Sequence, residues 1–216
     1  MKDAPRNSSV LDIGSSSGIL LNDLIDLGFE VNNLFGVDIS PNAVQNCKEN
    51  GIEHAYVMDA QNIELDKKFD YIIASDCLEH LEDDNKALQN WRTLLKPNGT
   101  IYVFVPAFMT LWSEHDVANM HYRRYTKKEL TSKMALNGFN LQRSNYWNFF
   151  LFPPVLVVRL LGKLTSSKGK EATGDLNKIS VFNIPLLSLI NFENKLHKYF
   201  RFPFGVSTYC IAKKAD

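Results

Sequence analysis

Two glycines bracket three serines in the pentapeptide Gly14-Ser15-Ser16-Ser17-Gly18, which follows the apolar stretch VLDI near the start of the chain. The pentapeptide fits the G-x-S-x-G pattern, in which the central serine is a hydrolase nucleophile. It also fits a short glycine-rich turn that lets a nucleotide approach the first turn of a helix. Ser16 is therefore either a nucleophile or a small residue that leaves room for a ligand.

The rest of the chain favours a ligand-binding turn over a nucleophile. A nucleophile elbow needs oxyanion donors, and the sequence contains no HGGG-like segment that would supply them. An acid, Asp38, instead lies 20 residues beyond Gly18 at the end of the next apolar stretch, where a carboxylate can bind ribose hydroxyls. A second acid, Asp12, lies two residues before Gly14. We therefore expect Ser16 to make room rather than to attack.

Strand-like and helix-like segments alternate through the first two thirds of the chain, which predicts a mostly parallel sheet covered on both faces. Ser40 before Pro41 is an N-cap signal, and Thr126 with Glu129 forms a capping-box signature. The predicted strands are 9–13, 34–38, 54–58, 70–74, 100–105, 139–147 and 206–212. The predicted helices are 19–27, 41–50, 84–95 and one that opens at 126 and stops at Gly138, and a tight turn is expected at 97–99. We expect one domain, 1–216, with an inserted cap at 148–205 whose centre, 165–174, is flexible.

Composition excludes several classes of protein. The 216 residues are 45% hydrophobic and 22% charged, which is ordinary for a globular chain. Lysine plus arginine equals aspartate plus glutamate at 24 each, so the basic footprint of a nucleic-acid binder is missing. Three widely spaced cysteines and the lack of an apolar leader favour a reduced, cytoplasmic chain. The apolar stretch 149–161 is shorter than the roughly 20 residues that span a bilayer, so only a peripheral membrane contact stays open.

An acidic turn without the G-x-G-x-x-G pattern suits a ligand that carries positive charge and no phosphate. At this point the chain resembles the class I S-adenosylmethionine-dependent methyltransferases across 10–138. The matching motifs are 10–18, 36–40 (GVDIS), 57–60 (VMDA), 69–81 (FDYIIASDCLEHL, with Glu79-His80 as in small-molecule methyltransferases) and 94–105.

The resemblance implies an α/β fold, a Rossmann-like, doubly wound, mostly parallel sheet of about seven strands whose last strand is antiparallel. It implies S-adenosyl-L-methionine as the cofactor and no metal site. Ser16 replaces the middle glycine of the family's turn, which is compatible with that turn if its φ is negative. The cofactor-binding residues that the resemblance implies are Asp12, Gly14, Ser15, Ser16, Gly18, Asp38, Ile39, Asp59, Ala60, Ser75 and Asp76.

Residues 112–125 (WSEHDVANMHYRRY) follow the fifth predicted strand and are expected over the pocket mouth. They resemble a segment of bacterial and archaeal methyltransferases associated with surface-glycan or lipid-linked metabolism. The candidate proton acceptors are His115 and His121. The candidate substrate-binding residues are His80, Asp116, Arg123, Arg124 and Tyr125, with the arginines on a phosphate or carboxylate. The alternative interpretation is that the Arg-Arg-Tyr run forms salt bridges and packs, and that His80 only caps its neighbours.

The leading hypothesis is a methyltransferase that acts on a small-molecule or lipid- or glycan-linked acceptor. A nicotinamide-nucleotide-dependent oxidoreductase and a non-catalytic cofactor-binding module on the same fold are the alternatives. The acceptor atom and the oligomeric state stay open.

Overall fold

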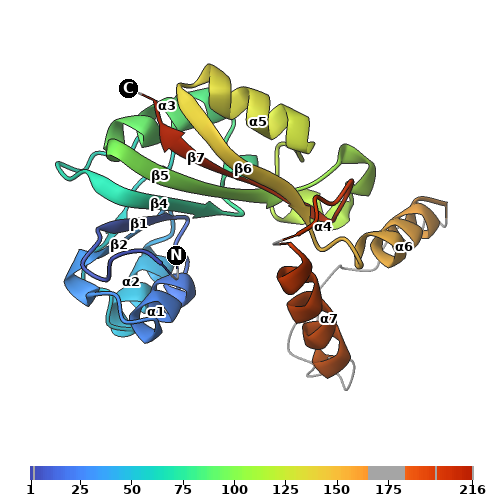
Figure 1. Cartoon of the computed structure of the whole chain (residues 1–216), viewed down its shortest axis with the longest axis horizontal. Helices are drawn as coiled ribbons and strands as arrows, with labels where there is room; N and C mark the ends of the chain where they lie inside the picture. Colours follow the sequence, from blue (N-terminus) through green and yellow to red (C-terminus); the bar gives the residue numbers. More distant parts are fainter. Residues whose placement is uncertain (2, 165–182, 198, 216) are drawn as a thin grey trace.

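The computed structural model describes residues 1, 3–164, 183–197 and 199–215, and contains one seven-stranded sheet in the order β3-β2-β1-β4-β5-β7-β6 (Figure 1). Strands β1 to β5 pair in parallel, and β7 runs antiparallel to both of its neighbours. The predicted fold class is confirmed. The strands are β1 (Val10–Ile13), β2 (Leu34–Asp38), β3 (Ala55–Val57), β4 (Phe69–Ser75), β5 (Leu95–Pro106), β6 (Phe139–Trp147) and β7 (Ser207–Lys214).

Helices cover the two faces of this sheet. Apolar side chains of α1 and α2 pack with Val10 and Leu34 on one face, and those of α3 and α5 pack with Leu11 and Ile72 on the other. Residues of β1 enter both clusters because a central parallel strand is buried on both faces. The helices are α1 (Ile19–Asp26), α2 (Pro41–Glu49), α3 (Asp84–Leu94), α4 (Glu114–Ala118), α5 (Lys127–Leu136), α6 (Phe152–Leu164) and α7 (Asn183–Leu196), with short 3-10 turns η1 (Val31–Asn33), η2 (Leu78–His80) and η3 (Met109–Leu111).

The predicted helix starts are correct at atomic detail. The Ser40 hydroxyl accepts a hydrogen bond from the Ala43 N–H at 3.3 Å at the start of α2. At the start of α5, Thr126 and Glu129 exchange side-chain-to-backbone hydrogen bonds of 3.2 Å and 2.7 Å. These bonds satisfy backbone donors that have no partner within the helix, so they fix where each helix begins.

The tight turn expected at 97–99 lies inside β5 instead. The strand pairs with β4 both before and after it, at Leu95↔Phe69 and at Thr100↔Tyr71. Four residues of β5 therefore stand opposite one residue of β4, and the strand absorbs the turn as a bulge. A methyl group on Gly99 would lie 2.9 Å from the Lys96 carbonyl oxygen, so the bulge needs a glycine there.

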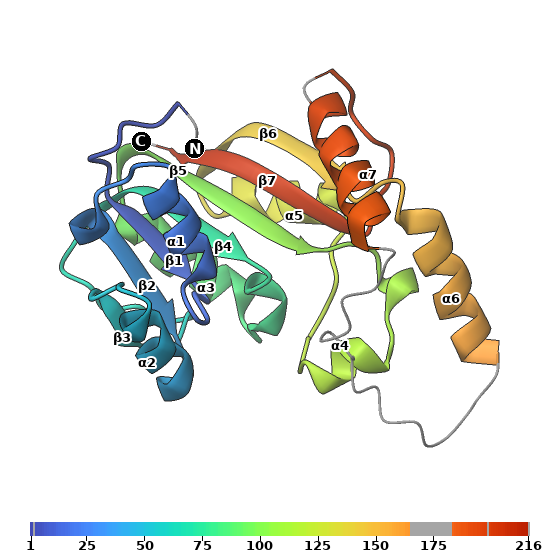
Figure 2. The same ribbon diagram turned by 90° about the horizontal axis from the view of Figure 1, so that it is seen from below.

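Helices α6 and α7 extend beyond the end of the sheet at which β6 stops and β7 starts (Figures 1 and 2). Their two attachment points are close, because the Val206 N–H donates a hydrogen bond of 3.4 Å to the Asn148 carbonyl. No helix in the described part of the chain is long and apolar enough to cross a bilayer. The segment 165–174 lies outside the described residues, and the single domain with an inserted cap at 148–205 stays a prediction.

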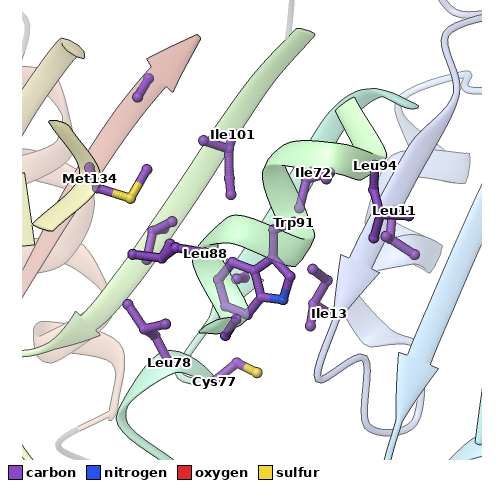
Figure 3. Packing of buried hydrophobic residues seen from close by; sticks show 14 of the residues in the cluster. Leu11, Ile13, Ile72, Cys77, Leu78, Leu88, Trp91, Leu94, Ile101 and Met134 are labelled. Atoms are coloured by element: carbon purple, nitrogen blue, oxygen red, sulfur yellow. The ribbon is translucent and has the colours of Figure 1, made fainter. Parts of the chain in front are cut away.

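Trp91 of α3 is the largest fully buried side chain and lies between α3 and the sheet (Figure 3). Its ring packs among residues such as Leu78 and Leu88, and its indole N–H donates a hydrogen bond of 2.8 Å to the Ala60 carbonyl. One side chain thus joins the core to the loop that follows β3.

We expect Trp91→Ala to lower the free energy of unfolding by about 3–5 kcal/mol, because it removes apolar contacts and leaves a cavity. Trp91→Phe keeps most of the ring and loses the hydrogen bond, so its cost should be clearly smaller. Urea unfolding followed by circular dichroism measures both, with Leu136→Ala, at an 86% exposed position, as the control. Equal losses for the alanine and phenylalanine variants would contradict this account.

Candidate functional site

The carboxyl ends of β1, β2 and β4 lie at one edge of the sheet, where the strand order reverses between β1 and β4. Open parallel sheets bind ligands at such an edge. A cavity of about 250 Å³ opens there, lined by Asp12, Gly14, Ser15, Ser16, Ser17, Ile19, Leu20, Asp23 and Ser75. A larger cavity of about 410 Å³ lies between β6 and the residues after α7, but none of the predicted cofactor residues lines it. We therefore place the candidate ligand site at the first cavity.

The turn between β1 and α1 has a backbone that requires its glycines. Gly14 and Gly18 have φ angles of 76° and 81°, and a methyl group on Gly18 would lie 2.7 Å from the Cys47 sulfur. The backbone N–H groups of Gly14 and Ser15 donate to the Val37 carbonyl at 2.8 Å and 3.0 Å. The turn is thus fastened to β2, and its glycines let a ligand lie directly against the backbone.

Ser16 also has a positive φ, 47°, so the condition of a negative angle, under which serine suits the family's turn, is not met. The physical reason is its backbone N–H, which donates a hydrogen bond of 2.9 Å to the Asp38 carboxylate. Among the described residues, no histidine hydrogen-bonds to the Ser16 hydroxyl, as a nucleophile would need. The other Asp38 oxygen accepts from the Ser40 N–H at 2.9 Å, so Asp38 joins the turn to the start of α2.

Asp12 is 3% exposed and lies at the end of β1, directly before the turn. Burial and the neighbouring Asp38 carboxylate raise the pKa of Asp12 to about 7, and no donor or cation in the described part of the chain offsets them. An ionised carboxylate is costly in such a position unless a positive charge approaches it. The cavity is therefore suited to a cationic ligand.

The predicted cofactor-binding residues Ile39, Asp59 and Ala60 lie after β2 and β3. Ile39 is 71% exposed next to Asp38, and the Asp59 carboxylate accepts a hydrogen bond of 2.8 Å from the Gln61 N–H. The Ala60 carbonyl is the acceptor for Trp91. An exposed apolar side chain and an acid are thus available beyond these strands, and their contact with a ligand stays a prediction.

Ser75 and Asp76 end β4 at the same edge. The Ser75 hydroxyl donates a hydrogen bond of 3.4 Å to the Asp76 carboxylate, and Asp76 has a φ of 49°. Burial raises the pKa of Asp76, although hydrogen bonding by Ser75 and the nearby histidines act against it. Asp76 therefore adds to the negative charge at this edge.

A second group of side chains lies beside the first, where η2 meets residues 112–125. The Tyr122 N–H donates a hydrogen bond of 2.8 Å to the Glu79 carbonyl, which brings His121 to His80 with ring centroids 4.5 Å apart. Glu79 is completely buried, and burial and the nearby Asp76 raise its pKa to about 8. Glu79 was not among the predicted site residues. Its signals in the sequence are the Glu79-His80 pair of the family motif and the position of an acid inside the apolar stretch CLEHL.

Asp116 holds His121 in place from α4. Its carboxylate accepts from the His121 Nδ1 at 2.9 Å and from the Arg124 Nε at 2.7 Å, all three groups being nearly buried. Burial alone would raise the pKa of Asp116, but the hydrogen bonds from Arg124 and His121 outweigh it and keep the pKa below its usual value. Arg124 also donates to the Ala107 carbonyl at 3.2 Å. The Arg124 side chain is therefore occupied by partners within the protein, Asp116 and the Ala107 carbonyl.

Arg123 and Tyr125 converge on Asp84 at the start of α3. Arg123 lies 2.9 Å and the Tyr125 hydroxyl 2.8 Å from the Asp84 carboxylate, and Tyr125 is only 3% exposed. The salt bridges and packing that formed the alternative interpretation are therefore present. Direct substrate contact by Arg123, Arg124 or Tyr125 stays a prediction that would require them to leave these partners. The exposed His115 instead faces Asn119, 2.9 Å away on the same helix.

The glycine and serine positions of the turn can be tested separately. We expect Ser16→Gly to change the free energy of unfolding by less than about 1 kcal/mol, because relief of the left-handed strain offsets the added chain entropy. Gly18→Ala should cost about 1–3 kcal/mol, since it meets both a positive φ and the Cys47 sulfur. Denaturant unfolding distinguishes the two, and a larger loss for Ser16→Gly would contradict this view of the turn.

The raised pKa of Asp12 predicts a pH effect of definite sign. Between about pH 4 and pH 7 the unfolded chain loses this proton while the folded chain keeps it, so stability falls as the pH rises. Asp12→Asn should remove this fall and, at pH 8, stabilise the ligand-free protein by on the order of 1–3 kcal/mol. Thermal unfolding across this pH range measures the effect, with the exposed Asp66→Asn as the control. A fall that is equally steep in Asp12→Asn would refute it.

Comparisons with known proteins agree with this geometry. Residues 11–103 match the family model of a methyltransferase domain. Ubiquinone biosynthesis O-methyltransferase of Pasteurella multocida is 30% identical over 109 residues, which cover 43% of this chain and 44% of that protein. The match thus spans less than half the length of this curated relative.

Two solved structures share the fold. A Haloferax volcanii chain solved in complex with the Trm112 methyltransferase activator has a TM-score of 0.65 at 18% identity, covering 99% of this chain and 85% of that one. Phosphoethanolamine N-methyltransferase 2 of Haemonchus contortus, solved with S-adenosyl-L-methionine, has a TM-score of 0.62 at 19% identity, covering 99% of this chain and 50% of that one. At these identities the likeness establishes the fold.

Proposed function

We propose, from the premise that the chain carries a class I S-adenosylmethionine-dependent methyltransferase domain, that it transfers a methyl group from S-adenosyl-L-methionine to a small-molecule acceptor. The observation that carries the proposal is the cavity at the strand-order reversal, where a glycine-bracketed turn lies beside a buried, uncompensated acid. The cofactor carries an ammonium and a sulfonium, and these charges suit Asp12.

The residues present fit this cofactor at each of its parts. Gly14 and Gly18 leave space against the turn, and Asp12 is a counter-charge for a cationic group. Asp38 is already oriented by two backbone N–H groups, so it is preorganised to accept hydrogen bonds from ribose hydroxyls. The exposed Ile39 offers an apolar surface for the adenine ring.

The same features disfavour the alternative functions. A dinucleotide cofactor brings an anionic pyrophosphate to this turn, where the buried Asp12 would repel it. A non-catalytic module would have no use for a second cluster of titratable groups, yet Glu79, His80 and His121 lie on the acceptor side. Methyl transfer accounts for both groups of residues.

The protein contributes alignment and proton handling to the reaction. When bound, S-adenosyl-L-methionine would supply an electrophilic methyl group to the acceptor, and its sulfur would keep the electron pair of the bond that breaks. Asp116 fixes the His121 ring through Nδ1 and leaves Nε2 directed away from that bond. In this arrangement the cluster around His121 takes up or holds the proton of the acceptor.

The finer proposal is an acceptor with a polar head and an apolar, lipid-like portion. Helices α6 and α7 carry exposed apolar side chains beyond the strand ends, among them Val158, Leu187 and Phe192 with exposed fractions of 64%, 59% and 54%. The similar Pasteurella multocida protein is named for ubiquinone biosynthesis, and this name supports an acceptor of this type. A peripheral contact with a membrane surface, where such an acceptor resides, belongs to the same proposal.

Calorimetry with S-adenosyl-L-methionine tests the cofactor site. We expect Asp38→Asn to weaken binding at least about tenfold, because a charge-assisted hydrogen bond is worth about 1.5–3 kcal/mol. Glu53→Gln, an exposed position on the loop before β3, is the matched control and should bind like the wild type. Unchanged affinity of Asp38→Asn would contradict the assignment, and tighter binding of a nicotinamide dinucleotide would favour the oxidoreductase. Mass spectrometry of candidate acceptors then seeks a product heavier by one methylene group.

A further inference from the structure

The carboxylate of Glu79 and the imidazoles of His80 and His121 present three donor atoms that all lie within 4.8 Å of one another. The residues come from two distant parts of the chain, η2 after β4 and the loop after α4. We propose that these three side chains form a binding site for a divalent transition-metal ion, with Zn²⁺ as the type ion.

The strongest argument is the state of Glu79. It has no exposed surface, and no hydrogen bond of regular geometry from the described residues reaches either carboxylate oxygen. Buried carboxylates in folded proteins are paired, hydrogen-bonded or bound to metal. The nearest fixed cation, Arg124, is committed to Asp116.

The donor set points to the class of ion. Imidazole nitrogen with carboxylate oxygen suits Zn²⁺ and its neighbours in the first transition series, whereas Mg²⁺ and Ca²⁺ prefer oxygen alone. A tetrahedral ion about 2.0–2.1 Å from each ligand sets the ligands about 3.3 Å apart. The three side chains therefore draw closer on binding. The His80 ring is only partly buried and can move toward the other two ligands, whereas Asp116 holds the His121 ring in place.

His121 also has the outer partner that metal-binding histidines use, because its Nδ1 meets the Asp116 carboxylate at 2.9 Å. Such a bond fixes the orientation of the ring and makes its other nitrogen a better ligand. Asp116 thereby becomes a positioning residue, and its salt bridge with Arg124 keeps its charge from adding to that of Glu79.

Three protein ligands leave one coordination position open, as in catalytic zinc sites. The site adjoins Asp76 at the end of β4, so it faces the same edge of the sheet as the cofactor cavity. A ligand with an oxygen donor, either water or a hydroxyl of the acceptor, would fit the open position, and the ion would then lower the pKa of that oxygen in place of the histidines acting as proton acceptors. This last step rests on the proposed methyl transfer, whereas ion binding does not.

The test is calorimetric titration of chelator-treated protein with Zn²⁺ alone, without cofactor or acceptor. We expect one ion per chain in the wild type and a loss of affinity of at least about 100-fold in Glu79→Gln and in His121→Gln. His54→Gln, a partly buried histidine outside the cluster, should bind as tightly as the wild type. Histidine ring signals in NMR spectra should shift on Zn²⁺ addition for His80 and His121 and stay unchanged for His54.

Protein stability gives a second, independent measurement. Zn²⁺ should raise the unfolding temperature of the wild type and leave that of Glu79→Gln unchanged, because an ion stabilises only a state that binds it. Wild-type protein without stoichiometric binding, or variants that bind as tightly as the wild type, would overturn the proposal. S-adenosyl-L-methionine binding by Glu79→Gln, followed separately, keeps a failure here distinct from a failure of the proposed function.

Discussion

A gathering of acids at one edge of a parallel sheet is the constraint on which this molecule depends. The parallel arrangement brings the ends of β1, β2 and β4 together, and each end carries an acid: Asp12, Asp38 and Asp76. Glu79 lies three positions after Asp76 in the sequence and is fully buried. Desolvation makes an unpaired charge costly. The acids near this edge therefore fall into those that have a charged or hydrogen-bonding partner and those that have none.

The acids that have charged or hydrogen-bonding partners, Asp84 and Asp116, hold residues 112–125 in place. Asp84 receives Arg123, Lys133 and the Tyr125 hydroxyl, and Asp116 receives Arg124 and His121. These contacts fasten residues 112–125 against η2 and α3, although the segment contains only one short helix. The removal of one partner would strand a buried charge, so each of these bonds fixes geometry more than it adds stability.

Asp12 and Glu79 are the buried acids without a compensating partner, and each is a place where a cationic ligand would stabilise the charged form. Asp12 faces the turn and Glu79 faces the two histidines, so the proposed function assigns the cofactor to one side of the edge and the acceptor to the other. The same physical deficit, a carboxylate without a cation, explains both sides. Asp38 belongs to neither group, because two backbone N–H groups already hold it.

Local signals made much of this architecture predictable from the sequence. The doubly wound sheet, the antiparallel β7 and the caps at Ser40 and Thr126 follow from patterns within a few residues or from the family resemblance. The features that the sequence did not predict have long-range causes. The φ of Ser16 is set by Asp38, 22 residues away, and the turn at 97–99 is absorbed because β4 pairs on both sides of it. The burial of Glu79 depends on Tyr122 and its neighbours, which no local pattern announces.

The hydrogen bond between Val206 and Asn148 has a consequence for how such a protein changes over time. Because the two ends of the α6–α7 excursion meet like the stems of a hairpin, its length and composition are decoupled from the register of β6 and β7. Insertions or exchanges within it cost little loop-closure entropy. The acidic edge of the sheet can therefore stay unchanged while the α6–α7 segment changes in length and sequence. Related proteins could in this way keep the same site and accept different classes of molecule.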